Sequence, residues 1–158
     1  LIEAGIGLEA VLQRLRQKGA GWLLLAAVLL PGIWALIWLH PYEYIYKNSL
    51  VGGVSSAYTQ YELDRQCISL REAIEHVNRI APLGTSVMVM RQISSVVPYA
   101  RPDLRLIDDR EPLRSAEYIL SCTWHAVGDL GPQGFERMYD VQRGEAVLSS
   151  LWQRLPQP

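Results

Sequence analysis

The stretch AGWLLLAAVLLPGIWALIWL, residues 20–39, decides the fold of this chain because its twenty residues carry no charged side chain. At a rise of about 1.5 Å per residue, a helix of this length spans roughly 30 Å, the thickness of the hydrocarbon core of a bilayer. A backbone in hydrocarbon must satisfy its own hydrogen bonds, so the stretch is predicted to be a membrane-spanning helix. Pro31-Gly32 would kink a soluble helix, but membrane helices tolerate such pairs.

The charges on either side of this helix predict its orientation. Arg14, Arg16 and Lys18 precede it, whereas the first basic residue after it is Lys47. An excess of positive charge marks the cytoplasmic side, so everything beyond Leu39 is expected to be extracytoplasmic. There are three alternatives. The run is too long for a cleaved signal peptide and too apolar for a buried soluble helix, while a lone signal anchor stays open.

Residues 1–19 are expected to be a cytoplasmic or interfacial segment, or the end of a preceding membrane helix. Both alternatives fit a stripe of apolar residues at helical spacing, namely Leu8, Val11, Leu12 and Leu15. The chain begins at Leu1 inside an apolar stretch and without an initiator Met. We therefore expect it to be part of a longer protein.

Aromatic residues crowd the exit of the predicted membrane helix, and residues 40–68 are expected to form an interfacial aromatic linker. Amphipathic rings favour the headgroup layer. The candidate site at this exit could form a wall or lid over a lipid-linked substrate, and its residues are Trp38, His40, Tyr42 and Tyr46. Interfacial anchoring alone is the favoured interpretation, because an aromatic belt needs no substrate to explain it.

Residues 69–158 predict a small extracytoplasmic α/β domain. Ser69 and Glu72 have the spacing of a capping box, and an apolar helix face follows until Pro82 ends it. Short apolar runs at 86–90, 104–107 and 118–122 predict strands, and residues 138–143 and 146–152 around Gly144 predict a closing hairpin. The expected fold is thus a membrane helix plus α/β: one transmembrane helix followed by a small Rossmann-like mixed-sheet domain with a C-terminal β-hairpin.

Composition excludes several classes of function. The 15 basic and 16 acidic residues nearly balance, so no bulk field would gather nucleic acid. The glycine-containing loop at 125–135 lacks the strand–GxGxxG–helix order of a dinucleotide site, and no Cys/His spacing suggests zinc. No cofactor or metal is therefore expected. Cys67 and Cys122 could pair in an oxidising compartment, but two separate buried thiols are the favoured interpretation.

The remaining polar candidates are weak. Asp108-Asp109 at a predicted strand end could bind metal or act as acid and base, but a solvated charged turn is favoured. His76 is expected to be exposed, opposite the apolar face of its helix. His125 ends a predicted strand, where open α/β sheets tend to bind ligands, but it has no partner identifiable in the sequence.

Glu62 and Asp64 alternate with apolar neighbours, which fits an edge strand or an extended linker. They belong to one of three stretches that resemble a single family. These stretches are HPYEYIYKNSLVGG at 40–53, YELD at 61–64 and SLREAIEHVN at 69–78, and the terminal hairpin around 143–145 is similar as well. The stretches resemble the C-terminal end of bacterial polytopic glycosyltransferases of the GT-C type, which are related to dolichyl-phosphate-mannose–protein mannosyltransferases.

The resemblance covers residues 40–78 well and the rest loosely. One departure is that the family continues YELD with Tyr-Trp-Gly, where this chain has Arg65, Gln66 and Cys67. The resemblance implies a multi-pass plasma-membrane enzyme that moves a sugar from a polyprenyl-phosphate carrier to an acceptor on the outer face. The catalytic acid of such enzymes lies in the first external loop, so no catalytic residue falls on this chain.

The implied partners are the bilayer, upstream membrane helices of the same protein and a lipid-linked sugar donor. The outer domain would cap the active site or help to select the acceptor. The alternative is a single-pass protein whose outer domain binds a small ligand or a partner chain. A soluble nucleotide-binding enzyme is not supported, because it would need residues 20–39 to be buried and a phosphate loop to be present.

Overall fold

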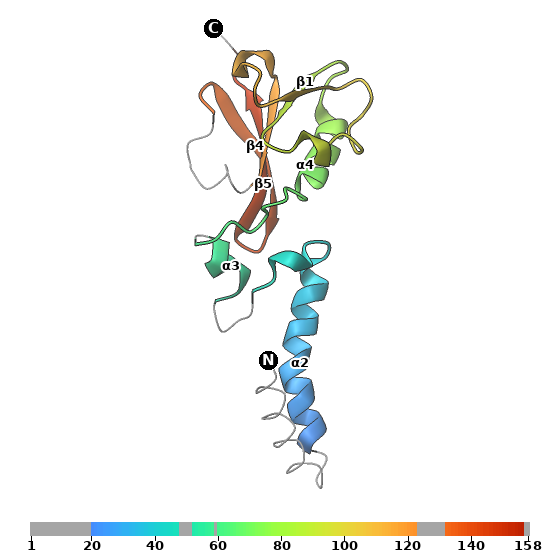
Figure 1. The fold of residues 1–158 in the computed structure, drawn as a ribbon, viewed down its shortest axis with the longest axis vertical. Helices are drawn as coiled ribbons and strands as arrows, with labels where there is room; N and C mark the ends of the chain where they lie inside the picture. Colours follow the sequence, from blue (N-terminus) through green and yellow to red (C-terminus); the bar gives the residue numbers. More distant parts are fainter. Residues whose placement is uncertain (1–19, 48–51, 59, 123–131, 157–158) are drawn as a thin grey trace. The chain divides into compact units, whose positions relative to one another are not determined.

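The computed structural model describes residues 20–47, 52–58, 60–122 and 132–156 (Figure 1). The chain divides into two compact units, Leu1–Tyr46 and Lys47–Pro158, and each is described by itself.

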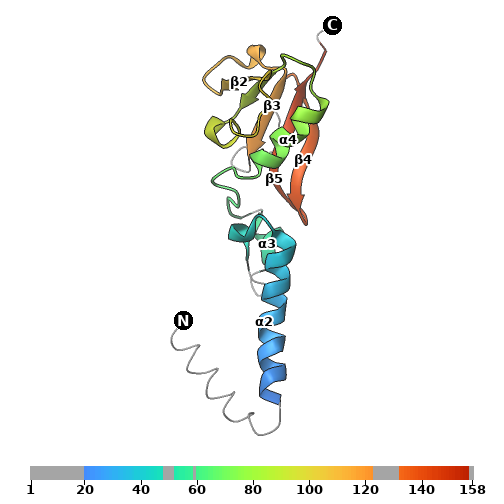
Figure 2. The same ribbon diagram turned by 90° about the vertical axis from the view of Figure 1, so that its right-hand side faces the viewer.

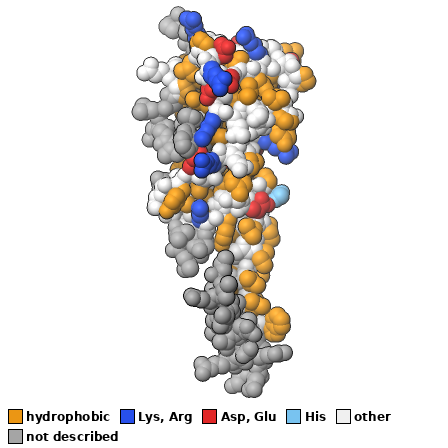
Figure 3. Space-filling model, in the orientation of Figure 1, with side chains coloured by type: hydrophobic (Ala, Val, Ile, Leu, Met, Phe, Trp, Pro, Cys, Tyr) orange, Lys and Arg blue, Asp and Glu red, His pale blue; other side chains and the backbone are white. Residues whose placement is uncertain are grey.

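The first unit contains the helix α2, Ala20–Leu39, which runs through Pro31 without ending there. Within the described residues, Gly21–Leu39 is the one helix long and apolar enough to cross a membrane. Its side chains are largely exposed, including Trp34 at 71% and Ile37 at 66%, and its visible surface in Figure 3 is mostly hydrophobic. A helix that exposes apolar side chains on all sides is unsuited to water and suited to lipid.

The second unit is built on a five-stranded mixed sheet (Figure 2). Its strands are β1 Ser86–Val89, β2 Arg105–Asp108, β3 Tyr118–Cys122, β4 Phe135–Arg143 and β5 Ala146–Arg154. Their order is β2-β1-β3-β5-β4. β1 is parallel to β2 and β3, whereas β5 is antiparallel to β3 and β4. The mixed sheet and the closing hairpin β4–β5 are therefore as predicted.

Helix α4, Leu70–Ile80, packs against one face of this sheet, where it contacts β3, β4 and β5. The helix is amphipathic, and its buried residues recur at helical spacing: Leu70, Ala73, Ile74 and Val77. The opposite face of the sheet carries a second apolar cluster, which includes Met88, Ile107, Ile119 and Trp152. The central strands β1, β3 and β5 are buried on both faces, whereas β2 and β4 at the two edges of the sheet are partly exposed.

The connections between the parallel strands do not confirm a Rossmann-like arrangement. Parallel crossovers usually contain an α-helix. Here the structure has only short 3₁₀ turns, Ile93–Ser95 between β1 and β2 and Leu113–Ser115 between β2 and β3. Prolines at positions 98, 102 and 112 remove amide donors from these segments, which explains why no α-helix forms there.

A short helix not predicted from the sequence, α3 Gly53–Tyr58, packs against β5 through the buried Val54 and Ala57. The backbone φ angles of Gly52 and Gly53 are +86° and +68°, in the left-handed region that favours glycine. A side chain at Gly52 would collide with Ser56. The pair at the end of the motif HPYEYIYKNSLVGG therefore has a conformational reason to be glycine.

Candidate functional site

The first candidate region is the exit turn, residues 39–46, in which the chain reverses at the end of α2. It contains a cis peptide bond between His40 and Pro41 and the 3₁₀ helix η2, Glu43–Ile45, which contacts α2. The amide of Tyr42 donates to the carbonyl of Leu39 at 2.6 Å, and the amide of Ile45 donates to that of Tyr42 at 3.0 Å. The motif HPYEYIY thus forms a hydrogen-bonded turn.

A polar pair lies on the outside of the exit turn. Nδ1 of His40 lies 2.6 Å from a carboxylate oxygen of Glu43; the side chain of His40 is largely exposed and that of Glu43 is half-exposed. A hydrogen bond from its own backbone amide, followed by the one with His40, holds the pKa of Glu43 below its ordinary value. Glu43 is therefore ionised at neutral pH, and it orients the imidazole of His40.

The four predicted site residues have different surroundings. Tyr42 is buried and meets Tyr44 edge to face, with ring centroids 6.4 Å apart. Trp38 is 51% exposed. The hydroxyl of Tyr46 lies against Gly32 of α2, where an added methyl group would meet it at 3.8 Å. Tyr42 therefore has a packing role, whereas Trp38 and His40 present accessible surface.

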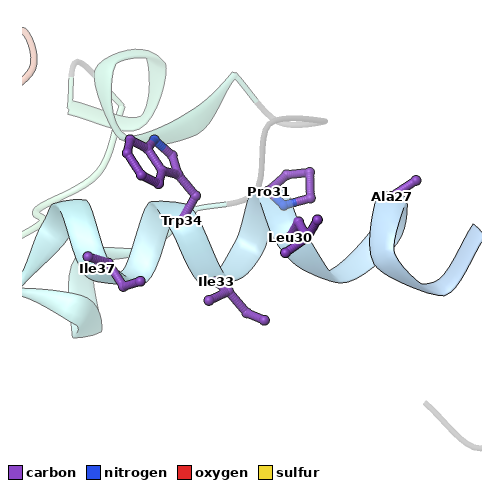
Figure 4. Close-up of a pocket in the computed structure, with 6 residues that line it drawn as sticks. All are labelled: Ala27, Leu30, Pro31, Ile33, Trp34 and Ile37. Atoms are coloured by element: carbon purple, nitrogen blue, oxygen red, sulfur yellow. The ribbon is translucent and has the colours of Figure 1, made fainter. Parts of the chain in front are cut away.

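An open groove runs along α2, and the described residues that line it all belong to that helix: Ala27, Leu30, Pro31, Ile33, Trp34 and Ile37 (Figure 4). These side chains carry no charge and no hydroxyl group. The groove suits acyl chains or another apolar helix, and its own residues supply no acid, base or nucleophile.

The second candidate region is the strap, defined here as residues 62–69, which precedes α4 (Figure 2). Three of its residues fasten it to the domain. Glu62 pairs with Arg91 at 3.2 Å, just after β1. Asp64 binds the start of α4, and Cys67 forms a disulfide with Cys122, the last residue of β3. The strap therefore lies at the carboxyl ends of β1 and β3.

Asp64 is fully buried and stabilises the turn that leads into α4. Its carboxylate accepts hydrogen bonds from the amides of Ile68 and Ser69, both at 3.0 Å, and from the hydroxyl of Ser69. The prediction of a capping box was wrong, because the hydroxyl of Ser69 donates to Asp64 and makes no cap bond. Glu72, the other half of that box, instead accepts from Arg143 at 3.2 Å.

The disulfide between Cys67 and Cys122 corrects the expectation of two separate thiols. The two Cα atoms are 5.4 Å apart, and both side chains are fully buried. The residues are 55 positions apart in the chain, so only the return of the strap onto β3 reveals their proximity. The backbone φ of Cys67 is +53°, in the left-handed region that favours glycine. The family that this stretch resembles has glycine at the corresponding position.

The acidic residues at the carboxyl ends of the strands stabilise turns, as the favoured interpretation predicted. Asp109 accepts the amide of Arg91 at 3.0 Å, and Asp108 accepts that of Arg110 at 2.9 Å. This second bond is the main cause that lowers the pKa of Asp108. Across the part of the chain that the structure describes, no cluster of three acidic, His or Cys residues could hold a metal ion.

His76 is not exposed as predicted, because it stacks on Tyr139 of β4. The ring centroids are 4.0 Å apart and the planes differ by 1°. Burial lowers the pKa of His76, and the nearby positive charge of Arg79 lowers it further. Burial and then the charge of Glu72 raise the pKa of the Tyr139 hydroxyl. His125, the other histidine considered, lies outside the described residues.

Comparison with protein families, curated proteins and solved structures found no match for this chain. The exit turn contains three of the four predicted site residues, with Trp38 directly before it, and the strap contains Glu62 and Asp64 of the YELD stretch. Among the residues described, the exit turn holds the imidazole–carboxylate pair of His40 and Glu43, and the carboxylate of Asp64 in the strap accepts backbone amides.

Proposed function

We propose that this chain is the C-terminal part of a bacterial GT-C-type membrane glycosyltransferase, which moves a sugar from a polyprenyl-phosphate donor to an acceptor on the outer face of the membrane. The residues 47–158 form an extracytoplasmic domain that caps the membrane active site or helps to select the acceptor. Catalysis itself belongs to a region upstream of this chain.

The exit turn is the observation that carries this proposal. The family-like motif HPYEYIY directly follows α2 and folds into a hydrogen-bonded turn with a polar pair, His40 and Glu43, on its outside. Aromatic and polar side chains at the end of a membrane helix occupy the headgroup depth, which is also the depth of the phosphate and sugar of a lipid-linked donor. Trp38 and His40 are exposed there, so they are available to contact such a donor.

The disulfide supports the placement of the domain outside the cytoplasm. Disulfides persist in oxidising compartments and are rare in the cytosol, where thiols are kept reduced. The same orientation follows from the basic residues that precede α2, because positive flanks remain cytoplasmic. The disulfide and the basic flank therefore both support the proposal that residues 47–158 lie on the outer side of the membrane.

The test is sugar transfer by the full-length protein in membrane vesicles supplied with radiolabelled polyprenyl-phosphate sugars. His40→Ala and Tyr42→Ala are compared with Tyr61→Ala, which removes a tyrosine that is 62% exposed and lies outside the exit turn. We expect at least a tenfold loss of transfer for the first two variants and none for the control. If the full-length protein transfers sugar from no such donor, the proposal is wrong. If both exit-turn variants keep full activity, the turn serves anchoring alone.

A second candidate is a single-pass protein whose outer domain binds a ligand or partner chain. The self-contained unit Lys47–Pro158, with its own sheet and core, favours it. The two candidates differ in what precedes α2 in the full-length protein. Cysteine-accessibility mapping that finds several membrane crossings upstream supports the transferase, whereas a single crossing supports the binding protein.

A further inference from the structure

The strap occupies the end of the sheet at which open α/β proteins bind their ligands. In such folds the ligand lies beyond the carboxyl ends of the parallel strands. Here Cys67 is bonded to the last residue of β3, and Glu62 is paired with Arg91 immediately after β1. A segment of the chain itself therefore covers these strand ends.

The contacts of the strap differ greatly in strength. The pair of Glu62 and Arg91 is partly exposed, and ion pairs of this kind contribute little. The buried carboxylate of Asp64 loses its hydration, which its hydrogen bonds to the start of α4 have to offset. The disulfide is the strong tie, because it removes a large share of the conformational freedom of the open chain.

The backbone conformation of Cys67 adds an unfavourable conformational free energy to the closed state of the strap. Its φ of +53° lies in a region that side-chain-bearing residues rarely adopt. Apart from the disulfide, the hydrogen bonds of this residue are local to the turn: its amide donates to the carbonyl of Asp64 at 3.0 Å, and its carbonyl accepts the amide of Leu70 at 3.2 Å. The closed strap thus depends on a covalent bond at the position where its backbone is least favourable.

We propose that oxidation closes the strap: the Cys67–Cys122 disulfide forms once the domain reaches an oxidising compartment and fixes the strap over the carboxyl ends of β1 and β3, and the reduced strap detaches. In this step the two thiols lose two electrons and two protons and form one S–S bond. A disulfide oxidant, such as an oxidised dithiol protein, takes them up, and its own S–S bond breaks to give two thiols.

The consequence is that the outer domain does not bind a small ligand at the carboxyl end of its parallel strands. The closure also fixes the point at which the membrane linker joins the domain, since Cys67 lies three residues before the start of α4. This inference does not depend on sugar transfer, but its oxidation step rests on the extracytoplasmic placement of residues 47–158 in the proposed function.

Trypsin provides a direct test on the complete chain in detergent micelles. Arg65 in the strap and Arg110 in the turn after β2 are both exposed, so the second is an internal control for the first. Two variants, C67A/C122A and C67G/C122A, remove the disulfide, and the second also removes the backbone cost at position 67. We expect cleavage after Arg65 to be at least tenfold faster in C67A/C122A than in the oxidised wild type, with cleavage after Arg110 unchanged. The C67G/C122A variant should fall between them.

Several outcomes would overturn the closure. Equal cleavage after Arg65 in wild type and both variants would show that the strap stays in place without the bond. Equal acceleration at every tryptic site would show that the disulfide holds the whole domain and not the strap. The last outcome concerns wild-type protein that is purified without reductant and then denatured. Alkylation of both Cys67 and Cys122 in this sample would show that the disulfide does not form.

Discussion

At the scale of single residues, Asp64 shows how a sequence motif acquires a structural role. The sequence YELD suggested a strand or linker, yet the last residue of that motif is a buried carboxylate that binds two amides and a hydroxyl before α4. Its position five residues before Ser69 is outside the usual spacing of a capping box. The sequence therefore predicts that Ser69 caps α4. In the structure, Asp64 instead accepts the hydrogen bonds from the amides of Ile68 and Ser69.

Asp64→Ala should destabilise the second unit by about 1–3 kcal/mol, because the amides of Ile68 and Ser69 would lose their acceptor. Denaturant unfolding of the full chain in micelles, followed by near-UV circular dichroism, measures the effect. Glu111→Ala is the control, since that side chain is exposed and should change the free energy of unfolding by less than about 0.5 kcal/mol. Equal effects of the two substitutions would contradict the buried role of Asp64.

The lowered pKa of His76 predicts that the folded state loses stability in mild acid. Its pKa is lowered in the folded state by burial and by Arg79, so the unfolded chain binds a proton more readily. Stability should therefore be fully present above pH ~6.5, the ordinary pKa of histidine, and should fall as the pH drops toward the folded-state pKa. The other charged groups near this stack are Glu72 and Arg143, which form an ion pair at 3.2 Å.

The measurement is the unfolding midpoint of the wild type and of His76→Phe between pH 7.5 and pH 5. The phenyl ring retains a stack on Tyr139 but cannot take a proton. The variant should therefore lose less stability on acidification than the wild type. Identical pH profiles would show that His76 does not titrate differently on folding.

At the scale of elements, the apolar composition of α2 is sufficient to predict this helix. A change in that composition should therefore impair its insertion into the membrane. Leu30→Arg places a charge in the middle of the apolar run, at an exposed position. It should impair membrane insertion by about 2.5–3.5 kcal/mol on insertion scales. Glycosylation mapping in microsomes measures insertion, with Leu30→Phe as a control that keeps the residue apolar. Normal insertion of the arginine variant would contradict the assignment of α2.

The elements of the second unit were predictable where their periodicity was strong. The apolar run at 118–122 coincides with β3, and the amphipathic pattern after Ser69 coincides with α4. The 3₁₀ crossovers and α3 were not predictable in this way. Segments of three to six residues are too short to show a period, and packing decides their conformation.

At the scale of the whole molecule, the proposed topology makes a prediction about access. Trypsin added to intact cells from which any outer barrier has been removed should cut the residues 47–158, for example after the exposed Arg110. A cytoplasmic protein in the same cells serves as the control for lysis. Cutting that requires lysis would place the domain in the cytoplasm, and the sugar-transfer proposal would fail with it.

The amino-acid sequence by itself determined the membrane-type helix, the mixed α/β class of the second unit and the closing hairpin. Each of these depends on local hydrophobic pattern, which a linear sequence contains in full. The tertiary structure alone decided the Cys67–Cys122 disulfide, the burial of Asp64 and the stacking of His76 on Tyr139. The disulfide and the stack join residues from separate parts of the chain, whereas the hydrogen bonds of Asp64 are local and its burial depends on the packing of the strap. The return of the strap and α4 to the sheet decides all three, and no local pattern encodes that return.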